Sequence, residues 1–222
     1  MKNLKFSLLS LGLIFSFACS NSNTDIIAET QNVDALASKP TAESLIKKLV
    51  DKRFTFADKN KDKTLVFSEF KGLESEHEDV MQKMFKEYDK NKDSKLTYEE
   101  FFNTDSEGIK SSLNSMFKML DQNRNSRIDG TGSASEELNI VVEVAFGTAT
   151  DAGKKVNIED VKKDYLSFDK DGDLNLTFDE YQTPELKYIL MAPVDPYKNS
   201  SNAKNPVSMK RFSDDLKAKI KK

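Results

Sequence analysis

The chain has very few of the residues on which most enzymes and cross-linked domains depend. Its 222 residues include one cysteine, one histidine and no tryptophan. The single cysteine, Cys19, excludes an intramolecular disulfide. One histidine and one cysteine are too few for a His/Cys metal cluster, and we find no nucleophile with an adjacent base and no phosphate-binding glycine loop. The sequence therefore predicts a protein that is not an enzyme.

A large excess of one charge sign is also missing. The chain carries 34 Lys and Arg residues against 37 Asp and Glu residues, a formal net charge of −3. This balance gives no strong attraction to a phosphate backbone, so we expect no nucleic-acid partner. Hydrophobic residues make up 37% of the chain and include 15 phenylalanines, which is enough for one or two small helical cores.

Oxygen-bearing side chains, in contrast, recur at a fixed spacing. The clearest case is a twelve-residue segment with donors at positions 1, 3, 5, 7 and 12, namely Asp169, Asp171, Asp173, Asn175 (through its backbone carbonyl) and Glu180. The carboxylate at position 12 can bind through both oxygens. Ca²⁺ takes six to eight oxygen ligands at about 2.3–2.6 Å, and this spacing can supply them. The segment therefore predicts a Ca²⁺ site.

The same spacing occurs three times earlier in the chain. One segment supplies Asp58, Asn60, Asp62, Thr64 and Glu69, and a second supplies Asp89, Asn91, Asp93, Lys95 and Glu100. Another contains the weaker candidates Asp121, Asn123, Asn125, Arg127 and Asp129. Its twelfth residue is Gly132, which cannot supply a bidentate carboxylate. Either Glu136 or Glu137 closes an enlarged loop there, or this segment only pairs with the last one.

The flanking residues repeat as well. An aromatic residue stands four positions before each segment (Phe54, Phe85, Phe117, Tyr165), and an aliphatic residue occupies position 8 (Leu65, Leu96, Ile128, Leu176). With these flanks, residues 41–191 resemble EF-hand proteins. The resemblance implies an all-α fold of two EF-hand pairs with short β-bridges between paired loops, and it implies Ca²⁺ binding without catalysis.

Position 6 of an EF-hand loop normally carries glycine, because the backbone turns there with a positive φ. Here it is Lys63, Ser94, Ser126 and Leu174. A residue with a side chain costs about 1 kcal/mol in that conformation. We therefore expect weak to moderate sites, with affinities around 10⁻⁵ to 10⁻³ M as in extracellular modules.

The N-terminus predicts export. Lys2 and Lys5 precede an apolar run at residues 6–18 that is too short to span a bilayer and reads as a secretory signal. Ala18 before Cys19 resembles a bacterial lipoprotein signal, in which Cys19 becomes the acylated N-terminus. We expect a lipid-anchored protein of the bacterial cell envelope. Cleavage by an ordinary signal peptidase, giving a periplasmic or secreted protein, is the alternative.

These patterns divide the chain into a signal peptide (1–18), a flexible tether (19–40), two hand pairs (41–105 and 106–191) and a basic C-terminal tail (192–222). In the second pair, residues 138–146 predict a helix from an N-cap at Ser135 to a C-cap at Gly147, although a strand is also compatible with its valines. Pro184 should interrupt the last exit helix. We expect residues 209–222 to form a frayed, solvated tail. The alternative is a basic helix that contacts anionic lipid or a partner.

Three roles follow from a calcium-binding protein of this kind. The first is a calcium-responsive interaction protein with a protein or peptide target. The second is a structural or adhesive module that Ca²⁺ stabilises, and the third is a regulatory subunit of an envelope enzyme. Methionines on the entering helices (Met81, Met84, Met116, Met119) either line a groove for a target helix or fill the core. The sequence favours core filling.

Overall fold

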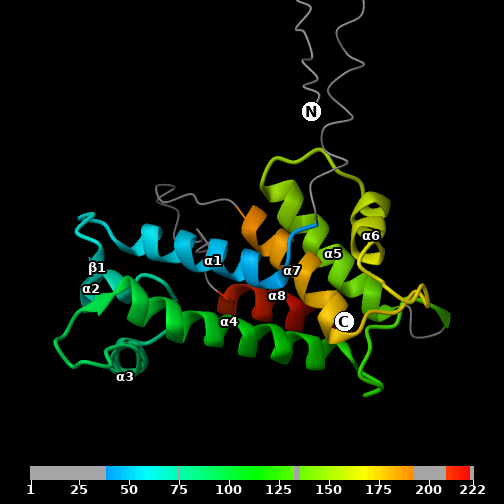
Figure 1. Ribbon diagram of the computed structural model, residues 1–222. Coiled ribbons are helices and arrows are strands. Elements are labelled where there is room, and N and C mark those ends of the chain that lie inside the picture. The colour runs from blue at the N-terminus through cyan, green and yellow to red at the C-terminus, as the bar shows by residue number, and fades with distance from the viewer. Residues whose placement is uncertain (1–38, 75, 133–135, 193–208, 221–222) are drawn as a thin grey trace, which may run out of the picture. The chain divides into compact units, whose positions relative to one another are not determined.

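The computed structural model describes residues 39–74, 76–132, 136–192 and 209–220. From Pro40 onward these residues belong to one compact unit (Figure 1). The predicted signal peptide, the predicted lipidation site Cys19 and nearly all of the tether lie outside the described residues, so those expectations stay predictions.

The first two loops pair through a short antiparallel ribbon. Helix α1 (Ala42–Ala57) leads into loop 1 (Asp58–Glu69), which contains strand β1 (Thr64–Leu65) and runs into helix α2 (Phe67–Phe70). Helix α3 (Glu78–Tyr88) leads into loop 2 (Asp89–Glu100), which contains strand β2 (Leu96–Thr97). Leu65 lies opposite Leu96 in the ribbon. The predicted bridge between position-8 residues is therefore confirmed for this pair.

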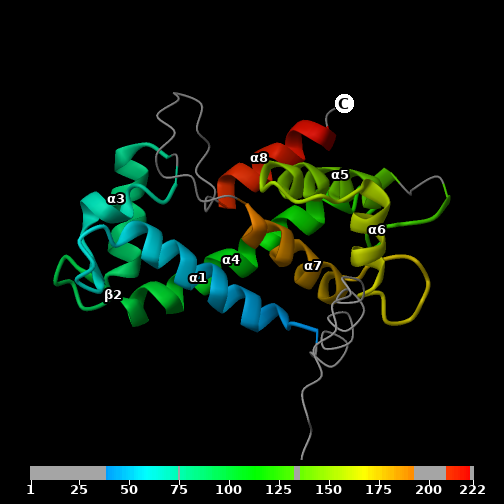
Figure 2. The same ribbon diagram turned by 90° about the horizontal axis from the view of Figure 1, so that it is seen from above.

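A single long helix connects the two pairs. Helix α4 (Tyr98–Leu120) has 23 residues, begins in loop 2 and ends at the start of loop 3 (Figure 2). At 1.5 Å per residue it is about 34 Å long. The boundary that we drew after residue 105 lies inside this helix. One rigid element thus carries both the exit from loop 2 and the entry into loop 3.

The second pair follows the same plan with longer connections. Loop 3 leads into helix α5 (Glu136–Asp151), and helix α6 (Ile158–Leu166) precedes loop 4 (Asp169–Glu180), which runs into helix α7 (Phe178–Met191). Ile128 of loop 3 and Leu176 of loop 4 exchange two backbone hydrogen bonds, at 2.8 and 2.9 Å. The expected all-α fold with β-bridges between paired loops is confirmed.

Three local expectations are wrong. Helix α5 continues through Gly147 to Asp151, because a glycine lowers helix stability without ending a helix whose face is buried; Ser135 lies outside the described residues. Helix α7 is unbroken across Pro184, although the missing N–H leaves one backbone carbonyl without its usual donor. Residues 209–220 form helix α8 (Met209–Ile220), which packs against α4 and α5 where we expected a frayed tail.

The aromatic residues that precede the loops hold the hands together. Phe54 packs edge-on against Phe101 with ring centroids 5.4 Å apart, and Phe117 packs against Phe178 at the same distance. Such pairs add to the hydrophobic gain from burial. Each contact joins the helix that enters one loop to the helix that leaves the paired loop.

A buried ion network ties α1 to α4. Arg53 is 4% exposed, and its guanidinium donates to both carboxylate oxygens of Asp105, at 2.9 and 3.1 Å, and to Glu74 at 2.9 Å. Tyr88 also donates to Asp105, at 3.0 Å. Although burial lowers the pKa of Arg53, these two carboxylates raise it above its ordinary value, so the guanidinium stays charged.

Among the described residues, no helix combines the length and apolar character needed to cross a membrane.

Candidate metal centres

Every loop is wrapped around its first aspartate. The carboxylate at position 1 accepts the backbone N–H of position 6 in each loop, at 2.9–3.1 Å (Lys63 to Asp58, Ser94 to Asp89, Ser126 to Asp121, Leu174 to Asp169). All four position-6 residues have a positive φ, between 65° and 68°. The sharp turn expected of a calcium loop is therefore present four times, in each case without glycine at position 6.

A glutamate closes each of the three complete loops. In loop 1, Glu69 accepts the backbone N–H of Lys59 at 3.0 Å and that of Val66 at 3.1 Å. These two donors stand at positions 2 and 9. We call the carboxylate held in this way the closing carboxylate. In an EF-hand loop this position supplies the bidentate ligand.

Loop 4 has the same closure, and loop 2 has a similar one in which Glu100 accepts the backbone N–H of Asn91, at position 3, at 3.2 Å. Glu180 accepts from the backbone amides of Lys170, at 2.8 Å, and Thr177, at 2.9 Å. Glu100 accepts from the backbone amide of Thr97 at 3.0 Å. Position 12 therefore lies where the sequence pattern requires in all three loops.

Glu137 closes loop 3, which we therefore define as Asp121–Glu137. Its two oxygens accept the backbone N–H of Gln122 at 2.9 Å and that of Asp129 at 3.0 Å. These donors again stand at positions 2 and 9. Of the two glutamates that the sequence offered, Glu137 is 3% exposed and Glu136 is exposed. Glu137 stands five residues beyond Gly132, the ordinary position 12. It still accepts the backbone N–H groups of the same two positions as the closing glutamate of loop 1 does.

Loop 4 has the densest negative charge. The carboxylate oxygens of Asp169, Asp171 and Asp173 lie within 4.8 Å of one another. Arg127 of loop 3 forms ion pairs with Asp173 and, at 3.9 Å, with Asp171. A side chain of loop 3 therefore partly neutralises two predicted ligands of loop 4, a contact that the sequence pattern does not reveal.

Two observations test whether these residues fit a divalent cation. The Oδ1 atom of Asp58 is buried and, among the described residues, has no hydrogen-bond partner. The clustered carboxylates of loop 4 repel one another, and a bound cation would offset that repulsion. Carboxylates and carbonyls are hard oxygen donors, which suit Ca²⁺. The residues present therefore fit this ion.

Hydrogen bonds lower the pKa of the closing carboxylates of loops 2 and 4. Although desolvation raises the pKa of Glu180, hydrogen bonds from Thr177 and Lys170 outweigh it and hold this pKa below its ordinary value. Desolvation is likewise outweighed at Glu100, whose pKa is lowered by hydrogen bonds from Thr97 and nearby backbone amides. Metal ligands must be deprotonated, so these two are ready to bind at neutral pH.

Two family models match the chain. The model of an EF-hand domain pair matches residues 78–132, and the calcium-binding region of secreted proteins acidic and rich in cysteine matches residues 15–104. The matches support an EF-hand calcium-binding family. The chain binds Ca²⁺.

The remaining comparisons add little. The search among curated proteins found no match. A solved structure described as a redox protein from Chlamydomonas reinhardtii aligns with 80% of this chain at 18% identity and a TM-score of 0.25. The alignment spans about half of that protein, 53% of its length. A similarity at this score supports no inference about this chain.

The structure brings some of the residues that the sequence selected close together. In loop 4 the carboxylates of Asp169, Asp171 and Asp173 lie close together, and in loops 1, 2 and 4 the position-1 carboxylate accepts the N–H of position 6. Coordination of Ca²⁺ by the predicted residues stays a prediction. In loop 3 the weaker candidates are partly engaged with one another, since the Asn123 and Asn125 amides donate to Asp129 at 2.7 and 3.0 Å. Glu137 is the donor that strict twelve-residue counting misses. The signal that reveals it is an acidic residue in the first turn of an apolar helix.

Proposed function

We propose that the protein is an exported, lipid-anchored EF-hand protein that binds a protein or peptide target in response to Ca²⁺. One observation carries the calcium response. Every closing carboxylate lies in the first turn of the helix that leaves its loop: Glu69 in α2, Glu100 in α4, Glu137 in α5 and Glu180 in α7. A carboxylate that moves toward an ion therefore moves a helix.

Loop 3 belongs to the proposed set of sites. With Glu137 it offers three acidic side chains, the others being Asp121 and Asp129. Loops 1 and 2 also offer three, and loop 4 offers four. Because the number of acidic ligands is a main determinant of calcium affinity, we expect loop 3 to bind about as well as loops 1 and 2.

Calorimetric titration of the soluble chain, residues 20–222, tests the sites. We expect four Ca²⁺ ions per chain, one of which is lost in each of the variants Glu69→Gln, Glu100→Gln and Glu180→Gln. Mg²⁺ should bind more weakly, because it demands an octahedral site and gives up its water reluctantly. Nanomolar affinity at every loop would contradict the tuning to extracellular calcium, and no binding would refute the proposal.

The lipid anchor rests on Cys19 and on the apolar run that precedes it. Several acyl chains would hold the protein stably at a membrane, since each buried CH₂ contributes about 0.8 kcal/mol. Mass spectrometry of the protein from bacterial membranes should find an acylated N-terminal Cys19. A Cys19→Ala variant that still fractionates with membranes would exclude the anchor.

A calcium-stabilised structural module is the second candidate. It is favoured by the burial of Met81 and Met116, each 1% exposed, because these side chains fill the core where a preformed groove would expose them. A hydrophobic dye separates the two roles. Increased dye binding with Ca²⁺ supports the interaction protein, whereas a higher melting temperature without dye binding supports the structural module. Co-purification with an envelope enzyme would instead support a regulatory subunit.

A further inference from the structure

Lysine side chains gather on the two calcium loops of the first hand pair. Loop 1 has lysine at positions 2, 4 and 6, and loop 2 has it at positions 2, 4 and 7 (Lys59, Lys61, Lys63, Lys90, Lys92 and Lys95). All six residues are exposed. The β1–β2 ribbon joins the loops at one end of the molecule, opposite the end that holds α6 (Figure 1, Figure 2). We call the exposed atoms of these six side chains the lysine surface.

The loop backbone holds these lysines with their amides toward the metal sites. The backbone N–H of Lys63 donates to Asp58 at 3.1 Å, and that of Lys95 donates to Asp93 at 2.9 Å. Among the described residues, none of the six lysine side chains forms an ion pair. Their positive charges are therefore available to a partner outside the chain.

Calcium would change this end of the molecule from nearly neutral to positive. Loop 1 has three acidic and three basic residues, and loop 2 has four acidic and three basic residues. Their combined charge is −1 without calcium and +3 with one Ca²⁺ in each loop. Loops 3 and 4 together have nine acidic and three basic residues, so two ions would raise their charge only from −6 to −2. Calcium would therefore make the first pair of loops, but not the second, attractive to an anionic partner.

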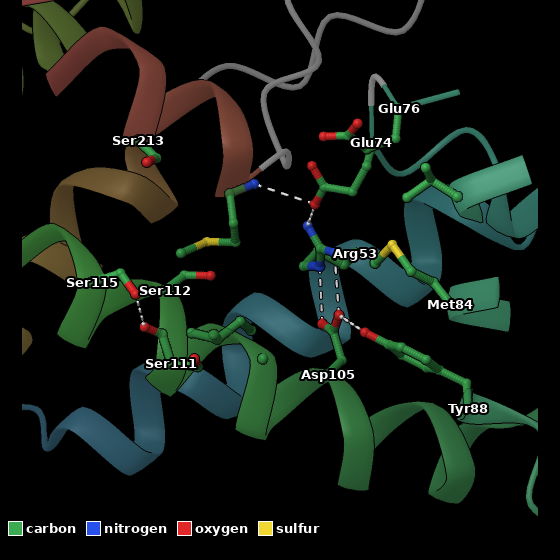
Figure 3. Close-up of a pocket in the computed structure, with 14 residues that line it drawn as sticks. Arg53, Glu74, Glu76, Met84, Tyr88, Asp105, Ser111, Ser112, Ser115 and Ser213 are labelled. Atoms are coloured by element: carbon green, nitrogen blue, oxygen red, sulfur yellow. Dashed lines mark hydrogen bonds and ion pairs between the residues drawn. The ribbon is translucent and has the colours of Figure 1, made fainter. Parts of the chain in front are cut away.

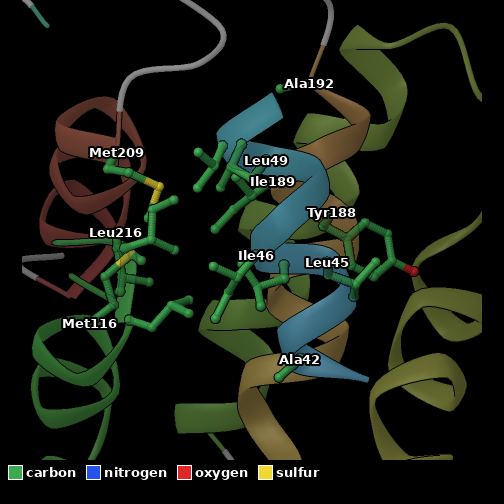
Figure 4. Packing of buried hydrophobic residues seen from close by; sticks show 14 of the residues in the cluster. Ala42, Leu45, Ile46, Leu49, Met116, Tyr188, Ile189, Ala192, Met209 and Leu216 are labelled. Carbon is green, nitrogen blue, oxygen red and sulfur yellow. The ribbon is translucent and has the colours of Figure 1, made fainter. Parts of the chain in front are cut away.

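The helices behind the lysine surface hold the two loops in fixed positions. Arg53 of α1, which enters loop 1, is bound to Asp105 of α4, which leaves loop 2 (Figure 3). Helix α1 also packs against α7, where Leu49 lies beside Ile189 in the buried core (Figure 4). Charges on such a base need little ordering of the backbone when they bind, so less of the binding free energy is lost.

We infer that the lysine surface binds the anionic headgroups of a lipid bilayer when loops 1 and 2 hold Ca²⁺. This contact depends on the proposed calcium sites, and its location depends on the proposed lipid anchor. A bilayer fits better than a single small anion, because the six charges are spread over two loops. A flexible tether of 22 residues (19–40) has an end-to-end distance of about 25 Å, which would keep the loops close to the membrane.

Flotation of residues 20–222 with lipid vesicles tests the contact. This chain includes the whole compact unit and lacks the predicted anchor. For vesicles of equal parts phosphatidylglycerol and phosphatidylcholine, we expect binding to be roughly tenfold stronger with Ca²⁺ than with EDTA. Binding should weaken as the salt concentration rises, because salt screens exposed charges. Equal binding to vesicles of phosphatidylcholine alone would overturn the inference.

Lysine variants locate the contact on the molecule. One lysine near an anionic bilayer contributes about fivefold to binding, so Lys61→Gln/Lys92→Gln should bind the vesicles roughly tenfold more weakly or worse. The control Lys154→Gln/Lys155→Gln removes two exposed charges from the connection between α5 and α6 and should match the parent chain within about twofold. Circular dichroism and calorimetry check that both variants are folded and keep their calcium ions. Equal vesicle binding by the two variants would overturn the inference.

Glutamate variants identify the loops that respond to calcium. Glu69→Gln/Glu100→Gln disables loops 1 and 2 and should remove the effect of Ca²⁺ on vesicle binding, whereas Glu180→Gln should keep it. Because the double substitution itself removes two negative charges, each variant is compared with and without Ca²⁺. A calcium effect that survives in Glu69→Gln/Glu100→Gln would show that the ion acts elsewhere, and it would overturn the inference.

The outcomes separate this contact from the proposed function. If calorimetry finds Ca²⁺ in loops 1 and 2 but the chain does not bind the vesicles, only the lipid contact fails. If calorimetry finds no Ca²⁺ at all, the proposed function fails and the calcium-controlled contact fails with it.

Discussion

Replacing Glu137 by glutamine would show whether loop 3 is a calcium site. The substitution keeps the size of the side chain and removes its charge. In the ion-free protein, one amide oxygen must serve the N–H groups of Gln122 and Asp129, which the carboxylate accepts at 2.9 and 3.0 Å. Because Glu137 is 3% exposed, water cannot easily replace the lost acceptor. We therefore expect the variant to lose about 1–3 kcal/mol of stability without calcium.

The loss of calcium affinity should be larger. A unit negative charge about 2.5 Å from a divalent ion contributes about 3 kcal/mol even at the dielectric constant of water. Glu137→Gln should therefore weaken binding at loop 3 by roughly two orders of magnitude. Calorimetric titration should count four ions for the parent chain and three for the variant.

The chain supplies its own matched control. Glu136 is the neighbouring residue in the same helix turn, but it is exposed. Glu136→Gln should still bind four ions, because the charge that it loses belongs to an exposed side chain. An unchanged count in Glu137→Gln, or a count of three in the parent chain, would refute the assignment of Glu137 as a ligand.

Three further substitutions test charges that the structure places close together. Arg127→Ala should raise calcium affinity at loop 4 by roughly three- to tenfold in a calorimetric titration, because the ion pair with Asp173 no longer competes. Burial raises the pKa of Glu185 from its ordinary 4.5 to about 7, so the wild-type chain loses stability as the pH rises from about 4.5 to 7. Glu185→Gln should therefore be more stable than wild type by about 3 kcal/mol at pH 8 and almost equal at pH 4 in urea unfolding with EDTA. Asp105→Ala leaves Arg53 without its main partner and should cost about 3–5 kcal/mol by the same measurement.

Exposed neighbours serve as controls for these three. Arg124→Ala in loop 3, Glu159→Gln in α6 and Glu107→Ala in α4 remove the same kind of charge at exposed positions. Each should stay within about 0.5 kcal/mol of wild type. A pH-independent difference for Glu185→Gln would show that folding does not raise the pKa of this carboxyl. Equal losses for Asp105→Ala and Glu107→Ala would show that the Arg53 network does not stabilise the core.

The loops could be predicted from the sequence because their geometry is local. Each calcium loop forms its own turn, so the spacing of Asp89, Asp93 and Glu100 already fixes where their oxygens converge. The pairing of loops was also predictable, since an aliphatic residue at position 8 has one partner of its kind in the neighbouring loop. These features depend on residues that are adjacent in sequence or repeat at matching positions.

The remainder depends on contacts between distant segments. Gly147 and Pro184 lie inside helices because the buried faces of α5 and α7 outweigh a weak local preference. The docking of α8 depends on Met209 and Leu216 finding a groove formed by α4 and α5, and nothing near them in the sequence specifies that surface. The choice between Glu136 and Glu137 likewise depends on which face of α5 turns inward.

Loop 3 is the point at which these distant contacts converge. Its closing carboxylate begins α5, its entering helix α4 also carries the closing carboxylate of loop 2, and Arg127 reaches two carboxylates of loop 4. An ion in loop 4 must compete with Arg127, while an ion in loop 3 acts on the helices that hold α8. If both loops bind, the titration of either should therefore shift when the other is disabled by Glu137→Gln or Glu180→Gln. If the calcium affinity of each loop does not change when the other is disabled, the β-bridge and Arg127 connect the two loops without coupling their calcium binding.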